Sequence, residues 1–262
     1  MPVNTHPKFF HELPIGVNLY RYINFEKFQS LIKKSSLFFC KVSAFEDKWE
    51  GTYPLSELKY RKDESYWIER ELNQTSEKDI DNIVANKMKD INGGYENFKD
   101  IVFVNCWMHD TKESYAMWKL YAEKEGGVLI KSSYERIYST LNQNPYLNFT
   151  MSRVFYIDYE NDYLYKGVEK LYEISEETRM HLCSACITDP FLHKRKHFEH
   201  EKEYRIILDI PPPQNIKREG NGIFVEIDLN ILIDEIILPP NCNNELEKKI
   251  KLMCFFLYTL SK

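Results

Sequence analysis

About seven β-rich segments are mixed irregularly with helical segments, and this order constrains the fold more than any other feature of the sequence. Runs of β-branched and aromatic residues bounded by turn residues predict strands. They cover 16–23, 36–43, 101–107, 127–132, 152–159, 222–229 and 234–240. We find no internal repeat and no long linker. The sequence therefore predicts one α+β domain over residues 1–262.

Helices are expected between these strands, where apolar residues recur every three or four positions. They are placed at 25–32, 54–90, 112–123, 132–141, 169–190, and from Asn243 or Asn244 onward. Asn24 is expected to cap the first of them. The stretch Asn92-Gly93-Gly94 is expected to stop the helical region that covers 54–90. Gly126-Gly127 is expected to end the helix at 112–123.

Composition excludes several classes of protein. The 262 residues are 43% apolar and 29% charged, which is typical of a soluble globular protein. A net charge of −5 argues against a general binder of nucleic acid or membrane surfaces. We see no signal peptide and no apolar stretch of membrane-spanning length. Because the six cysteines are scattered, we expect reduced thiols and a cytoplasmic protein.

The stretch HFEHEKEYRIIL, residues 197–208, carries dense charge into an apolar strand. Alternate residues of a strand share a face, so Glu201, Glu203 and Arg205 are expected on one side. Neighbouring carboxylates repel each other and need a cation or a ligand to offset the repulsion. One interpretation is a structural ion pair of Glu203 with Arg205 or Arg21. The other is a functional pair of carboxylates that stabilises positive charge in a transition state, as in glycosyl cleavage.

Two metal-binding patterns were weighed. His193, His197 and His200, with Glu201, would line one face of a helix. The neighbouring basic residues Lys194 to Lys196 oppose a cation and no HEXXH motif is present, so no metal is expected. His181, Cys183 and Cys186 form H-x-C-x-x-C, but no second ligand pair follows at a suitable distance, which favours packed thiols.

Four pieces of the chain, in order, resemble a bacterial family of domains of unknown function, number 2971. They are LYRY (19–22), AFEDKWEG (44–51), SYAMWKLYAEKEGGVLI (114–130) and FEHEKEYRI (198–206). The resemblance covers roughly residues 16–210, and the strands and helix of 222–262 are expected to complete the core. The chain departs from the family pattern at Glu46, Lys48, Phe198 and Lys131-Ser132.

That family is in turn similar to the ADP-ribosyltransferase superfamily. This second resemblance implies a split, mostly antiparallel mixed β core flanked by helices, with NAD bound as a substrate between two small sheets. It also implies an early basic residue on the cofactor, an aromatic clamp on nicotinamide and a late glutamate on the nicotinamide ribose. It rests in part on likeness of fold, which does not fix function.

Carried onto this chain, the resemblance implies specific residues. The catalytic residues would be Glu203, Glu201 and Arg21, with Glu203 as the first choice of carboxylate. The cofactor would contact Arg21, Tyr20, Ser43, Trp118 and Tyr121. Trp118 and Tyr121 lie three apart on one helix and could present a stacking wall. Each also has an ordinary explanation: ion pairing for Arg21, a turn for Ser43, and core packing for Trp118 and Tyr121.

Each of the further polar residues has two possible roles, one functional and one structural. Asp47 and Glu50 would orient Arg21 or an acceptor, or else cap their loop. Lys194 or Lys196 would lie near a phosphate-bearing acceptor, or else belong to a solvated basic turn.

Three functions follow. The first is an NAD-dependent ADP-ribosyltransferase or NAD glycohydrolase with a protein or nucleic-acid acceptor, in the role of a bacterial toxin or phage-defence effector. The second is a non-catalytic domain that binds a nucleotide or a partner. The third is a metal-dependent nuclease that uses Asp47, Glu50, Glu201 and Glu203. The apolar final helix allows deep burial or a homodimer interface.

Overall fold

A large, mostly antiparallel β-sheet organises the first of two compact units. The computed structural model describes residues 3–5, 13–122, 126–166, 175, 188–208 and 216–259. The chain divides into unit 1 (residues 1–41, 103–153 and 201–262) and unit 2 (residues 42–102 and 154–200). Each unit is built from segments that are distant in sequence.

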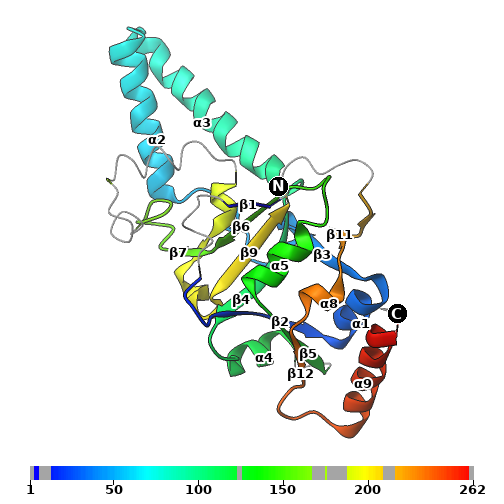
Figure 1. Cartoon of the computed structure of the whole chain (residues 1–262). Helices are drawn as coiled ribbons and strands as arrows, with labels where there is room; N and C mark the ends of the chain where they lie inside the picture. The colour runs from blue at the N-terminus through cyan, green and yellow to red at the C-terminus, as the bar shows by residue number, and fades with distance from the viewer. Residues whose placement is uncertain are drawn as a thin grey trace. The chain divides into compact units, whose positions relative to one another are not determined.

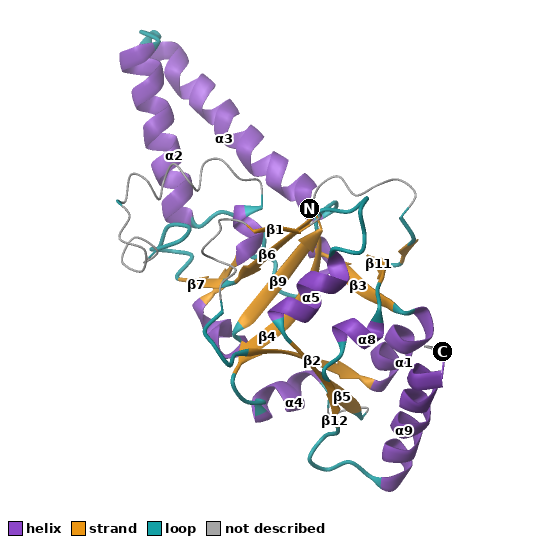
Figure 2. Ribbon diagram, in the orientation of Figure 1, coloured by secondary structure: helices purple, strands orange, loops and turns teal. Residues whose placement is uncertain are grey.

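The unit 1 sheet has ten strands. Its main path runs β1-β6-β9-β4-β2-β5-β12, while β3 joins β4 and carries β11 and β10 (Figures 1 and 2). The strands are β1 Val3–Thr5, β2 Asn18–Asn24, β3 Ser36–Lys41, β4 Phe103–Asp110, β5 Gly127–Ser132, β6 Phe149–Arg153, β9 Glu203–Leu208, β10 Arg218–Glu219, β11 Gly222–Glu226 and β12 Glu235–Ile237. Among the described strands of this sheet, β1 and β6 form the one parallel pair. The α+β class and the mostly antiparallel sheet flanked by helices are confirmed.

The two faces of this sheet differ in cover. The first face carries Leu19, Arg21, Trp107 and Tyr204, and the second face carries the residues that alternate with them. The first face packs under α1 Phe25–Lys34, α5 Tyr134–Leu141, α8 Leu229–Leu232 and α9 Asn244–Thr259, all of which contribute to one hydrophobic core. On the second face, Tyr20, Tyr22 and Met108 pack against α4 Tyr115–Tyr121.

Polar side chains fix the helix ends of unit 1. Asn24 Oδ1 accepts a hydrogen bond from Lys27 N at 2.9 Å, and Asn243 Oδ1 accepts one from Leu246 N at 2.8 Å. Both predicted caps are thus present.

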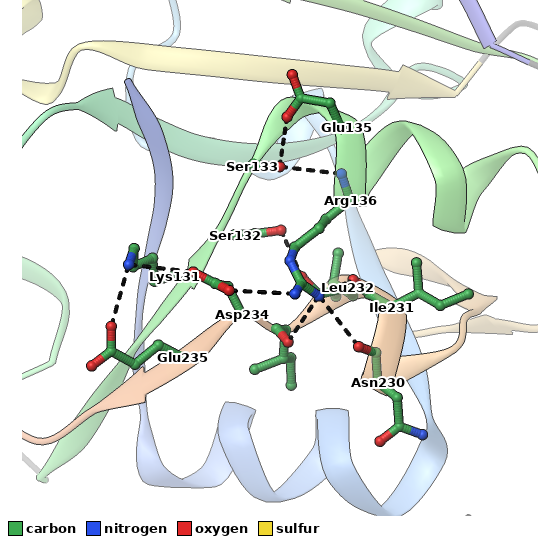
Figure 3. Close-up of polar contacts among 11 residues, drawn as sticks. Lys131, Ser132, Ser133, Glu135, Arg136, Asn230, Ile231, Leu232, Asp234 and Glu235 are labelled. Atoms are coloured by element: carbon green, nitrogen blue, oxygen red, sulfur yellow. Dashed lines mark hydrogen bonds and ion pairs between the residues drawn. The ribbon is translucent and has the colours of Figure 1, made fainter. Parts of the chain in front are cut away.

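The short helix α8 is held from its carbonyl end. The Arg136 guanidinium donates to the Ile231 carbonyl oxygen at 2.9 Å and forms an ion pair with Asp234 at 3.4 Å (Figure 3). It also reaches the carbonyl oxygens of Asn230 and Ile233, each at 3.4 Å. A cationic fork at this position satisfies carbonyls that the helix leaves unbonded.

Unit 2 contains a helical hairpin and a two-stranded parallel sheet. Its elements are η1 Val42–Ala44, α2 Leu55–Trp67, η2 Ile68–Leu72, α3 Glu77–Lys99, β7 Phe155–Ile157, η3 Asp189–Leu192 and β8 His193–Arg195, while η4 Lys196–Glu201 leads into β9. α2 and α3 lie side by side (Figure 1). Of the helix expected at 169–190, residues 169–174 and 176–187 lie outside the described residues, and Asp189 and Pro190 belong to a 3₁₀ turn.

The predicted helix stop at Asn92-Gly93-Gly94 is wrong. α3 continues through both glycines to Lys99, whose side chain is buried. A glycine inside a helix costs about 1 kcal/mol, which the remaining turns of a 23-residue helix can offset. The single strand expected at 152–159 is also wrong, since β6 ends at Arg153 and β7 begins at Phe155.

Candidate functional site

The opening of β9 places Glu203 and Arg205 together on the second face. Glu203 Oε1 accepts a hydrogen bond from Arg205 Nε at 2.7 Å, and Oε2 accepts one from Nη2 at 3.1 Å. Arg205 is fully buried and Glu203 is 5% exposed. Glu203 and Arg205 lie on the same face, as the alternation predicts. Together they form a bidentate ion pair within the charged stretch 197–208.

Arg21 lies on the opposite face from Glu203. Tyr20 pairs with Met108, and Met108 pairs with Glu203, so these three share the second face. Arg21 follows Tyr20 along β2 and points to the first face, where its guanidinium lies 5.9 Å from the centre of the Trp107 ring. The Glu203 carboxylate contacts Arg205 and lies on the opposite face of the sheet from Arg21. Burial lowers the pKa of Arg21 to about 10, and Cys106 partly opposes this shift.

Glu201 reaches a different partner. It ends the 3₁₀ turn before β9, and its Oε1 accepts a hydrogen bond from the Tyr121 hydroxyl at 2.9 Å. Lys202 adopts a positive φ of 41°, and this turn separates Glu201 from the regular alternation of the strand. The strand that was expected to carry both Glu201 and Glu203 begins only at Glu203, so the position of Glu201 is set by the preceding turn.

The short helix α4 carries the aromatic residues that the family resemblance singled out. Ser114 caps it, with Oγ accepting from Met117 N at 3.4 Å, and the Ser114 amide donates to the Tyr22 hydroxyl at 2.6 Å. The edge of the Trp118 ring meets Tyr22 with centroids 5.3 Å apart. The Trp118 indole N–H donates to Glu113 at 2.9 Å. These bonds fix α4 against β2.

Five residues therefore gather on the second face within unit 1, and we name them the Tyr–Glu cluster: Tyr20, Tyr22, Trp118, Tyr121 and Glu201. Their exposures differ. Trp118 is 3% exposed, whereas Tyr121 is 45% exposed and presents its ring to solvent. The expected stacking wall of Trp118 and Tyr121 thus has one buried member and one accessible member. Burial raises the pKa of Tyr22 to about 12, so its hydroxyl stays protonated at neutral pH.

An ion pair lies at the end of β4, next to His109. Lys202 Nζ contacts Asp110 Oδ2 at 2.6 Å. Burial, and after it the charges of Arg153 and Lys202, lower the pKa of His109 to about 4, while Asp110 opposes the shift. His109 is therefore a neutral imidazole at physiological pH. His109 is not predictable from the sequence, because an isolated histidine in a strand gives no signal of its surroundings.

The other predicted residues belong to unit 2. Ser43 lies in a 3₁₀ turn, and its hydroxyl donates to Asp100 Oδ1 at 2.8 Å. Asp47 accepts from Arg195 at 2.9 Å, and Glu50 pairs with Lys194 at 3.3 Å. Within unit 2, Asp47 and Glu50 thus contact the basic residues ahead of β9.

His193, His197 and His200 do not line one face of a helix. His193 lies in β8, is fully buried, and accepts a hydrogen bond from Tyr165 N at its Nε2, 2.8 Å away. His197 and His200 lie in the 3₁₀ turn and are exposed. Within the described ranges, no three His, Cys, Asp or Glu side chains gather as a metal ion requires. The stretch His181, Cys183, Cys186 lies outside the described residues.

Comparison with known proteins supports part of the family resemblance. The model of a family described as "Protein of unknown function (DUF2971)" matches residues 117–206, which run from α4 into β9. These residues include MWKLYA and all of FEHEKEYRI, while LYRY and AFEDKWEG precede the match. No curated protein and no solved structure matches the chain.

The described part of the chain contains no helix that is long and apolar enough to cross a membrane. The four described cysteines, Cys40, Cys106, Cys242 and Cys254, form no disulfide bonds with one another.

Proposed function

We propose that the chain is an ADP-ribosyltransferase-like enzyme or glycohydrolase that consumes NAD, with Glu201 as its carboxylate. The observation that carries the proposal is the hydrogen bond from Tyr121 to Glu201. It joins the two motifs of the family resemblance, MWKLYA and FEHEKEYRI, at one place in unit 1. An accessible aromatic ring beside a carboxylate suits the planar nicotinamide ring, which is positively charged in NAD.

The proposed reaction requires the site to stabilise one developing positive charge. As the glycosidic bond of NAD breaks, its electron pair leaves with nicotinamide, and positive charge develops on the ribose. A fixed carboxylate binds that charge only as it forms, which lowers the barrier. The Tyr121 hydroxyl fixes the orientation of the Glu201 carboxylate. Water or an acceptor nucleophile then forms the new bond to the ribose carbon and gives up its proton to solvent.

Glu201 is preferred to Glu203 because the two carboxylates have different partners. Both oxygens of Glu203 receive hydrogen bonds from a fully buried guanidinium. A carboxylate so engaged must break an ion pair before it can meet a substrate. Glu201 is hydrogen-bonded to Tyr121, whose ring is accessible, and this contact places the carboxylate beside a surface on which a planar group can stack.

A second function, a non-catalytic domain for a nucleotide or a partner, is favoured by the position of Arg21. In the resemblance, the early basic residue and the late glutamate serve one site. Here Arg21 and Glu203 point to opposite faces of the sheet. A chain that had lost the chemistry would keep the Tyr–Glu cluster while its early arginine points to the other face. The roles of toxin or phage-defence effector stay predictions.

The test is nicotinamide release from NAD, with cell extract as a source of acceptors. Wild type is compared with Glu201→Gln, Tyr121→Phe and Glu203→Gln, and Glu235→Gln serves as an exposed control in unit 1. We expect release by wild type and the control, a loss of about 100-fold or more in Glu201→Gln, and a smaller loss in Tyr121→Phe. Release that survives Glu201→Gln would move the carboxylate role to another residue. No release by wild type would favour the binding function.

A further inference from the structure

A small hollow in unit 1 lies beside α4, where the chain segment before α9 approaches it. Its walls include Tyr115 and Trp118 of α4 and Pro239, Pro240 and Asn241 of the segment that precedes α9. Its volume is about 160 Å³. Pockets for drug-sized ligands begin at roughly 300 Å³, so this hollow suits one ring system rather than a whole dinucleotide.

The walls are flat and rigid. Proline rings and aromatic rings lose little conformational entropy when a ligand covers them, and they favour planar partners. Tyr115 is 66% exposed, so its ring is accessible, and Lys119 Nζ lies 5.3 Å from its centre. Trp118 is buried apart from the part that lines the hollow, and its N–H is already donated to Glu113. It therefore offers apolar surface and no hydrogen bond.

The polar side-chain groups of the lining residues are the Asn241 and Asn243 amides, the Tyr115 hydroxyl and the Trp118 N–H. None of its lining residues is charged, so a charged ligand group would lose hydration there without a compensating partner. In the portion of the chain that is described, the Asn241 side chain makes no hydrogen bond. An asparagine amide offers one donor and one acceptor side by side, which is the arrangement that pairs with N7 and the amino group of adenine.

We propose that this hollow binds a neutral purine base of the adenine type, stacked on Tyr115 and paired with Asn241. Such a ring comes from a free nucleoside or from the base of a larger nucleotide. The inference does not depend on NAD cleavage, because a chain that releases no nicotinamide can still bind a base here.

Adenosine is the probe, and calorimetry on the whole chain is the measurement. Wild type is compared with Tyr115→Ala and Asn241→Ala, and Tyr146→Ala is the matched control. Tyr146 is an exposed tyrosine of the same unit, 87% accessible, that does not line the hollow. Since the two test residues are also exposed, neither change is expected to disturb folding.

We expect saturable binding of adenosine to wild type and to Tyr146→Ala, and about tenfold weaker binding to each test variant. Uridine, which lacks the purine edge, should bind at least several-fold more weakly than adenosine. If the natural ligand is the base of a larger nucleotide, NAD should compete with adenosine for the hollow through its adenosine part. The absence of saturable binding, equal binding of uridine, or an equal loss in Tyr146→Ala would each overturn the proposal.

Discussion

The carboxylate of Glu203 and the guanidinium of Arg205 meet within one strand through two hydrogen bonds, of 2.7 Å and 3.1 Å. Removing one partner of such a buried pair leaves the other charge without compensation, which typically costs about 3–5 kcal/mol. We therefore expect Glu203→Gln to lower the free energy of unfolding by about that amount. Urea denaturation followed by circular dichroism measures it.

A double variant and a surface variant serve as controls. Glu203→Gln combined with Arg205→Met removes both charges and is expected to recover part of the lost stability. Glu245→Gln breaks the exposed pair with Lys249 and is expected to change stability by less than about 1 kcal/mol. If Glu203→Gln is as mild as Glu245→Gln, the ion pair does not have the structural role given to it.

The Arg136 fork on the carbonyl oxygens near α8 is the second stability test. Lysine keeps the charge but presents a single ammonium group, so it cannot serve several carbonyls and Asp234 together. We expect Arg136→Lys to cost about 1–2 kcal/mol, measured by thermal unfolding. Arg70→Lys changes an exposed arginine of unit 2 and should alter the free energy by less than about 0.5 kcal/mol. Equal effects of the two variants would contradict the assigned role of Arg136.

Two glycines with different surroundings provide the third test. A Cβ at Gly127 would lie 2.3 Å from the Ile23 carbonyl oxygen, so Gly127→Ala must move a strand and is expected to be strongly destabilising. A Cβ at Gly93, inside α3, meets nothing within 4 Å. Gly93→Ala is therefore expected to stabilise the protein by about 0.5–1 kcal/mol. Thermal unfolding of both variants checks the contrast, and a stability loss in Gly93→Ala would argue against a continuous α3.

Local chemistry made most of the strands and helix caps predictable. Asn24 and Asn243 cap helices as expected because a short polar side chain before an apolar periodic segment has few other uses. The alternation of Glu203 and Arg205 was also readable, since a strand has a period of two. The stop at Gly93 was not, because a glycine ends a helix only where the backbone turns left-handed, and here the helical backbone continues.

The sequence predicted which residues belong to the candidate site but not how they are arranged in space. Trp118, Tyr121 and Glu201 were singled out and are brought together, whereas Arg21 is turned away from Glu203. Which face Arg21 occupies depends on the register of β2 against β4, and one residue of shift exchanges the faces. The partners of Asp47 and Glu50 depend likewise on contacts between distant segments, and no local pattern specifies them.

The pKa of His109 gives the last prediction, a dependence of stability on pH. Its folded pKa, about 4, lies below the ordinary value of 6.5, so the unfolded chain binds a proton that the folded chain does not bind between these values. Stability should therefore fall as the pH drops from 6.5 toward 4, with about 1–3 kcal/mol from this residue. His109→Gln should make that fall shallower in urea titrations at each pH, whereas His197→Gln, at an exposed position, should leave it unchanged. If the two variants have the same pH dependence as wild type, burial of His109 beside Arg153 and Lys202 is not what lowers stability in acid.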